Sequence, residues 1–142
     1  MMKNILVAID GSENSKRALL ETRQLAECTG ASVTILNVSN DLSKYPYLMN
    51  STYVVQTNED LKEFGKKLID DSLKVFEGFQ GTIDTMVRSG EVAREIIEEA
   101  EGKDYDLIVM GSRGLGTFSR TMLGSVSNKV LNHVDKDVLI IR

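Results

Sequence analysis

Short apolar runs with the length of β-strands recur along the chain. Residues 5–9 and 107–110 are continuously apolar, as expected of strands that are covered on both faces of a parallel sheet. Residues 33–38 and 138–141 are predicted to be further strands of the same sheet. Residues 82–88 alternate between apolar and polar positions instead, which predicts an edge strand with one solvated face.

The intervals between these runs show helical periodicity. Apolar residues three and four positions apart predict a helix over residues 14–29, and Gly30 follows it where a helix C-terminus favours positive φ. A second helix is predicted to begin near Thr57, because Thr57-Asn58-Glu59-Asp60 resembles a capping box. Residues 91–101 and a segment through Val130 are predicted to be the remaining helices.

The order of these elements predicts the fold class. Strands that alternate with helices favour an α/β fold with a single doubly wound, five-stranded parallel sheet and helices on both faces, a Rossmann-like arrangement. The 142 residues suffice for one domain but not two, so residues 1–142 are predicted to form a single domain. Residues 39–57 are the least regular part and are predicted to be a long loop.

The composition limits which classes of partner and which compartment are expected. The net charge of −4 lacks the basic excess of a nucleic-acid-binding surface. No apolar run reaches the roughly 18 residues that cross a bilayer, and the N-terminus lacks the pattern of a signal peptide. The single cysteine, Cys28, permits no internal disulfide, which suits a reducing compartment. We therefore expect a cytoplasmic protein with neither nucleic acid nor membrane as a partner.

Two segments follow predicted strands at the edge where open parallel sheets bind their ligands. One is Asp10-Gly11-Ser12, and the other runs from Gly111 through a glycine-rich stretch to Ser127. Glycines let main-chain amides approach an anion and adopt positive φ. The helix expected to start at Gly124-Ser125 would add its positive dipole end. Together these features predict a phosphate-binding site.

Side chains of the glycine-rich stretch offer further donors for a phosphate. Ser112, Ser125 and Ser127 carry hydroxyls, and Arg113 and Arg120 carry positive charge. The common phosphate motifs are nevertheless missing, because no lysine stands at the P-loop position and no G-x-G-x-x-G follows the first strand. One cysteine and one histidine also make a zinc site or a catalytic triad implausible, so no catalytic residue is assigned.

The spacing Gly111-x2-Gly114-x9-Gly124-Ser125 resembles the ATP-binding signature of the universal stress protein family. Residues 5–12 are similar to that family's first strand with its aspartate, and residues 36–38 to its second strand. Residues 88–97 resemble its third strand-to-helix turn, and residues 138–142 its closing strand. The resemblance, to the UspA-like, ATP-binding members, covers the whole chain except the long loop.

The resemblance implies an adenine nucleotide α-hydrolase-like fold that holds ATP together with Mg²⁺ or Mn²⁺. Asp10 would contact the ribose or the metal-bound phosphates and is the one protein ligand implied for the metal. The residues implied to bind the nucleotide are Ala8, Ile9, Asp10, Ser12, Val38, Met110, Gly111, Ser112, Arg113, Gly114, Gly124, Ser125, Val126 and Ser127.

Three functions remain open on the sequence. The first is an ATP-binding sensor or regulator of the stress response with no or slow hydrolysis, because Asp10 is the one obvious carboxylate at the site. The second is a slow Mg-dependent ATPase, and the third is an interaction protein with an empty pocket. The strand at residues 138–141 is apolar on both faces, although the strand order of the family it resembles would place it at a sheet edge. This predicts a homodimer built around it, which the resemblance also implies.

Several residues also have an ordinary structural interpretation. Asp10 could equally be a helix cap or a turn residue, as Asp often is after a strand. Cys28 is expected to be a small core residue, and His133 to be structural or exposed. The glutamates of the third helix, Glu99 among them, are expected to form a solvated face.

Overall fold

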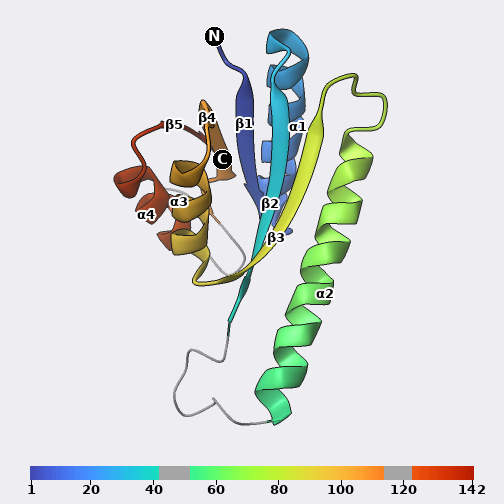
Figure 1. Cartoon of the computed structure of the whole chain (residues 1–142), viewed down its shortest axis with the longest axis vertical. Helices are drawn as coiled ribbons and strands as arrows, with labels where there is room; N and C mark the ends of the chain where they lie inside the picture. The colour runs from blue at the N-terminus through green and yellow to red at the C-terminus, as the bar shows by residue number, and fades with distance from the viewer. Residues whose placement is uncertain (42–51, 114–122) are drawn as a thin grey trace.

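Nine helices and strands alternate in the computed structural model, which describes residues 1–41, 52–113 and 123–142, with the backbone alone over 52–56 (Figure 1). The elements are β1 (Asn4–Ile9), α1 (Glu13–Thr29), β2 (Ser32–Asn40), α2 (Thr52–Val75), β3 (Ile83–Gly90), α3 (Val92–Gly102), β4 (Leu107–Gly111), α4 (Ser125–His133) and β5 (Asp137–Ile141). Their order confirms the alternation predicted from the sequence.

All five strands are parallel and lie in the order β3-β2-β1-β4-β5. From β1 the chain first adds β2 and β3 on one side and then β4 and β5 on the other. The winding therefore reverses between β1 and β4, which is where sheets of this kind bind ligands. The predicted fold class, an α/β fold with a single doubly wound sheet, is confirmed.

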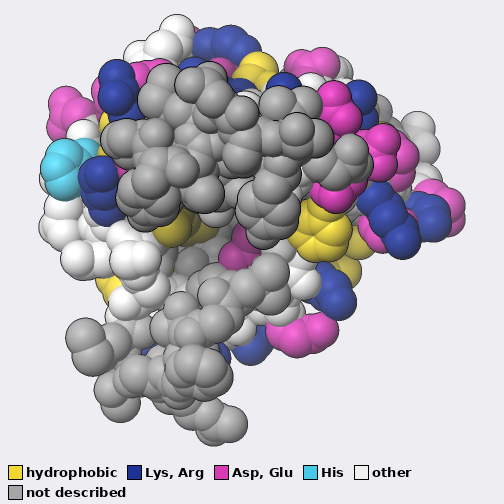
Figure 2. Space-filling view, turned by 90° about the horizontal axis from the view of Figure 1, so that it is seen from below, with side chains coloured by type: hydrophobic (Ala, Val, Ile, Leu, Met, Phe, Trp, Pro, Cys, Tyr) yellow, Lys and Arg dark blue, Asp and Glu magenta, His cyan; other side chains and the backbone are white. Residues whose placement is uncertain are grey.

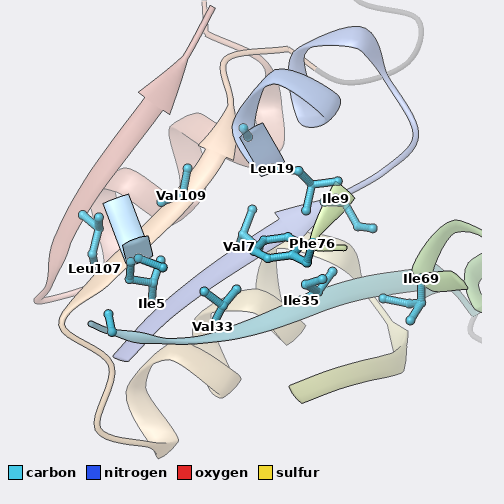
Figure 3. Packing of buried hydrophobic residues seen from close by; sticks show 13 residues of the cluster. Ile5, Val7, Ile9, Leu19, Val33, Ile35, Ile69, Phe76, Leu107 and Val109 are labelled. Atoms are coloured by element: carbon cyan, nitrogen blue, oxygen red, sulfur yellow. The ribbon is translucent and has the colours of Figure 1, made fainter. Parts of the chain in front are cut away.

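Helices cover both faces of the sheet. On β1 the odd-numbered residues Ile5 and Val7 pack in the cluster beneath α1 and α2, which Figure 3 shows around Phe76. The even-numbered Leu6 and Ala8 pack in a second cluster beneath α3 and α4. Because successive side chains of a strand point to opposite faces, a continuously apolar run is what such a central strand needs.

The start of α2 differs from the prediction. The helix begins at Thr52, so Thr57 lies inside it, and the capping-box interpretation of residues 57–60 is wrong. Val54 and Val55, near the observed start, have low helix propensity. Once a helix is nucleated, however, each residue added in front of it gains a backbone hydrogen bond, and this outweighs weak propensities.

β3 is an edge strand, as predicted, but its second face is not simply solvated. Met86 packs against the cluster beneath α3, and Arg88 reaches the acidic side of that helix. Its guanidinium Nη1 lies 3.0 Å from Glu99 Oε2, and Nη2 lies 3.0 Å from Glu95 Oε2. The alternating polar residues of this strand predicted a solvated face, but in the structure that face carries an ion-pair network.

Glu99 is buried, which corrects the expectation of a solvated acidic face on α3. Its side chain is 5% exposed and accepts hydrogen bonds from Tyr105 Oη and Lys103 Nζ, each at 2.8 Å. Burial by itself would raise the pKa of Glu99, but these donors and the charge of Arg88 outweigh it and lower the pKa. A helical acidic residue is thus drawn inward by partners on other elements.

Two smaller expectations have opposite outcomes. Cys28 is exposed, so its assignment to the core is wrong; it falls on the solvent side of α1, whereas Ala26 of the same turn is buried. His133 is exposed, as expected, and its Nδ1 lies 2.7 Å from the Lys129 carbonyl oxygen. Among the helices of the described ranges, none combines the length and the apolar character that crossing a membrane requires.

Candidate functional site

A cleft of about 340 Å³ opens at the carboxyl ends of β1, β2 and β4, at the reversal of winding. This volume lies within the range of small-molecule sites. Leu61 and Phe64 of α2 form one wall, and Val92, Ile96 and Val126 of α3 and α4 form the other. Figure 2 views the molecule from this end, where an acidic side chain lies near the centre between apolar patches.

The structure brings most of the sequence-predicted residues together along this cleft. Those that line it are Ala8, Ile9, Asp10, Ser12, Val38, Met110, Gly111, Arg113, Gly124, Ser125, Val126 and Ser127. Ser112 does not line it, because its side chain is buried against α1. Gly114 and Arg120 lie outside the described residues.

Side chains accept two of the amide N–H groups at the start of α1. Asp10 Oδ1 accepts the Ser12 N–H at 2.9 Å, and Ser12 Oγ accepts the Ser15 N–H at 3.2 Å. Gly11 makes this turn with φ of 87°, a conformation that side chains disfavour. Asp10 is therefore a turn residue and not the helix cap, which is Ser12. Asp10 Oδ2 makes no hydrogen bond to another described residue.

The start of α4 is built differently. Its N-cap is Gly124, which has no side chain to accept a helix amide. The first intrahelical bond runs from the Asn128 N–H to the Gly124 oxygen at 3.0 Å. The amides of Ser125, Val126 and Ser127 precede that bond and have no acceptor within the helix. They line the cleft together with Arg113, which makes its polar end electropositive.

Gly111 and Gly124 were expected to adopt positive φ and to turn their amides toward an anion, and this expectation is wrong. Neither Gly111 nor Gly124 has positive φ, and the Gly124 N–H donates to the Ser112 oxygen at 2.6 Å rather than facing the cleft. A Cβ at Gly111 would lie 2.8 Å from the Cβ of Asn14. Gly111 therefore allows the start of α1 to pack closely on β4. The amides available to an anion are those of the helix that follows Gly124.

Two of the three predicted hydroxyl donors are occupied inside the protein. Ser112 Oγ accepts a hydrogen bond from Asn14 Nδ2 at 3.0 Å, and Ser127 Oγ donates to the Ser112 oxygen at 2.9 Å. Both serines are buried, whereas Ser125 is exposed at the mouth of the cleft. The Ser112 N–H also donates to the Ile141 oxygen at 2.7 Å, which fixes this segment to β5.

Sequence reasoning missed the contribution of α2 and of the end of β2. The spacing of Leu61 and Phe64 is that of the apolar face of a helix and gives no sign that they line a cleft beyond the sheet. Asn37 lines the cleft and donates from Nδ2 to the Ile9 oxygen at 2.9 Å, so it joins the ends of β1 and β2. Its place beside Asp10 at the same sheet edge was the available signal.

The side chains at the cleft would give a metal ion few ligands. Within the part of the chain that the structure describes, no group of three or more His, Cys, Asp or Glu residues could hold an ion. Asp10 offers one carboxylate oxygen. Mg²⁺ commonly binds through one or two carboxylates, substrate phosphates and water. The residues present therefore fit a metal that is brought by a polyphosphate rather than one held by the protein alone.

Comparison with known proteins assigns the chain to a family. The model of the Universal stress protein family matches residues 1–142. The chain belongs to this family. A curated relative, Universal stress protein YxiE of Bacillus subtilis, is 33% identical over 149 aligned positions that cover 100% of both chains. The resemblance stated from the sequence is thereby confirmed at the level of the family.

Solved structures of this family share the fold. The hypothetical protein MJ0577 is 26% identical, with a TM-score of 0.87 over 99% of this chain and 96% of that one. A universal stress protein in complex with cAMP is 24% identical, with a TM-score of 0.72 over 99% and 97%. One from Archaeoglobus fulgidus in complex with dAMP is 18% identical, with a TM-score of 0.66 over 100% of each chain.

Proposed function

We propose that this universal stress protein binds ATP in the cleft, together with Mg²⁺ or Mn²⁺, and acts as a nucleotide sensor or regulator with no or slow hydrolysis. One observation supports it above all: the cleft is apolar along its walls and ends at the uncapped start of α4. A nucleotide has the same two parts, an apolar base and an anionic tail. Two proteins of this fold form complexes with the adenine nucleotides cAMP and dAMP.

The proposal assigns the two parts of the ligand to the two parts of the cleft. Ala8, Val38 and Met110 form its apolar floor and would take the adenine. Asp10 would bind the ribose or the metal-bound phosphates. The phosphates would lie at Arg113 and Ser125, where the free amides and the positive end of the helix dipole favour negative charge.

The architecture of the cleft favours binding over hydrolysis. Phosphoryl transfer to water needs a group that orients the water in addition to the groups that hold the phosphates and metal. Among the described residues that line the cleft, the carboxylate is Asp10, and its Oδ1 is held by the Ser12 N–H. Single-turnover assays of wild type and Asp10→Asn test this, because a slow ATPase would release phosphate above background in the wild type alone.

A thermal-unfolding titration with Mg-ATP tests the binding itself. A ligand that binds only the folded state stabilises it by about 4 kcal/mol at a thousandfold excess over Kd. We expect the midpoint to rise with ATP in the wild type and less in Arg113→Gln. Arg94→Gln, which removes the same charge from the exposed side of α3, should respond like wild type. An unchanged wild-type midpoint at millimolar ATP would contradict the proposal.

The same proposal includes a homodimer and a cytoplasmic location. β5 lies at the edge of the sheet, and its apolar residues 138–141 are only partly buried. A second copy of this strand would cover that edge. The exposed thiol of Cys28 suits a reducing compartment. Sedimentation velocity at micromolar concentration should show a dimer, and a monomer there would refute this assembly.

A further inference from the structure

The α2 wall presents an aromatic ring to the cleft. Phe64 lines the cleft but is 50% exposed, although the next residue in the helix, Gly65, is buried. Leu61 lies one turn earlier on the same side and also lines the cleft. A ligand in the cleft that covers the exposed part of this ring would remove apolar surface from water, which is favourable.

The position of α2 against the sheet is fixed by close contacts. A Cβ on Gly65 would lie 2.5 Å from Asn37 Oδ1 and 3.3 Å from Ser39 Oγ, so a side chain there would displace either Asn37 or the helix. Ser39 Oγ donates to the Leu61 oxygen at 3.1 Å, one turn before Gly65. Glycine costs about 1 kcal/mol in a helix interior relative to alanine, and here it allows the helix to approach the end of β2.

The tip of the ring lies beside the turn that carries Asp10. A Cβ built on Gly11 would be 3.8 Å from Phe64 Cζ and 3.0 Å from the nearest methyl carbon of Leu68. The ring therefore stands next to the turn at Gly11, which directly follows Asp10, and lines the same cleft as the start of α4.

We propose that Phe64 is a specificity-determining residue, which packs against the base and ribose of the bound nucleotide, and that Gly65 positions it. This inference rests on the proposed function. It adds that the site selects a nucleoside through α2, on the opposite wall from the phosphate-binding end. A bare polyphosphate would gain nothing from the ring.

The test compares ATP with adenosine in wild type, Phe64→Ala, Phe64→Tyr and Arg113→Gln, with dissociation constants from calorimetry or competition. Phe64→Ala should weaken both ligands by about tenfold, within the range of an aromatic–base contact. Phe64→Tyr should stay within about twofold of wild type because it keeps the ring. Arg113→Gln should weaken ATP more than adenosine. Leu73→Ala, which truncates another exposed apolar residue of α2, should leave both constants unchanged.

The unfolding midpoint without ligand separates binding from structure. It should be nearly unchanged in Phe64→Ala, since the ring is half exposed. Gly65→Ala should fold and bind both ligands more weakly, because a Cβ would displace α2 or Asn37, both of which line the cleft. If Phe64→Ala binds ATP and adenosine as wild type does, the inference fails while the proposed function stands. If wild type binds neither ligand, both fail. A tenfold loss in Phe64→Tyr would also overturn the inference.

Discussion

Among the helices that begin beside the cleft, α1 and α4 have first turns that are built in opposite ways. At α1 the side chains of Asp10 and Ser12 accept the Ser12 and Ser15 amides, so two of the four amides that precede the first intrahelical bond are satisfied without a ligand. At α4 the cap is Gly124, which accepts through its backbone oxygen alone. Both starts line the same cleft. The difference indicates that α4 has more main-chain donors left for an anion than α1 has.

The two kinds of N-cap also differ in how much they contribute to helix stability. Replacing a good N-cap side chain by alanine costs a helix about 0.5–2 kcal/mol, although glycine costs only a few tenths. A glycine N-cap at position 124 therefore costs the helix little stability, and it leaves the amides of Ser125 and Val126 at the cleft without a side-chain acceptor. A phosphate bound there would accept hydrogen bonds from these amides. It would then have the role at α4 that the Ser12 hydroxyl has at α1.

The largest expected effect comes from making α4 resemble α1. Gly124→Asp adds a carboxylate that can cap the helix and repel phosphate, so the affinity for Mg-ATP should fall about a hundredfold, or ~2.7 kcal/mol. Stability without ligand should change by only a few tenths of a kcal/mol. Calorimetry and urea unfolding measure the two quantities. Gly102→Asp, in open space at the end of α3, is the matched control.

A second substitution tests what holds the two regions together. Gly111→Ala places a Cβ 2.8 Å from that of Asn14, at the contact between β4 and the start of α1. Overpacking of this kind costs about 1–3 kcal/mol, which should appear as a lower urea midpoint at unchanged m. Gly102→Ala has nothing within 4 Å and should not lower the midpoint. Equal stability of the two variants would show that Gly111 has no packing role.

Removing the cap of α1 should affect stability rather than binding. Ser12→Ala deletes the acceptor of the Ser15 N–H and should cost about 1 kcal/mol of unfolding free energy. Because the hydroxyl is already occupied by this bond, the affinity for Mg-ATP should stay within about twofold of wild type. A variant with unchanged stability and much weaker binding would mean that α1 contributes to the ligand site directly.

The smallest effect is expected for a serine of α4, where a substitution should change binding rather than stability. Ser125→Ala removes an exposed hydroxyl in the first turn, so unfolding should be unchanged while the affinity for Mg-ATP falls about threefold, or ~0.6 kcal/mol. Calorimetry under identical salt conditions gives both values for comparison with Ser12→Ala. If Ser125→Ala instead lowered stability and left the affinity intact, the distinction between the two helix starts would be lost.

The fold was predictable because its signals are local. Continuous apolar runs such as residues 5–9 mark strands covered on both faces, and their alternation with helices fixes the parallel sheet. The position of Asp10 followed from the same order, since carboxyl ends of strands share one edge. The start of α2 at Thr52 did not, because helix extension outweighed the cap-like Thr57.

The chemistry of individual side chains depended on distant partners and was not predictable in the same way. Ser112 is occupied by Asn14, and Glu99 is held by Tyr105, contacts that exist only after the elements pack. Phe64 gave the apolar signal of a core residue, and only the length by which α2 passes the sheet places it at the cleft. The sequence alone could locate the site but not assign its donors.

The most direct test of the account is a titration of isotope-labelled protein with Mg-ATP, followed through the amide resonances of both helix starts. We predict large, saturable shifts at Ser125 and Val126, whose amides have no helical acceptor, and small ones at Ser12 and Ser15, whose amides are already bonded. Shifts confined to Ser12 and Ser15, with Ser125 and Val126 unmoved at saturation, would contradict the claim that α4 receives the phosphates.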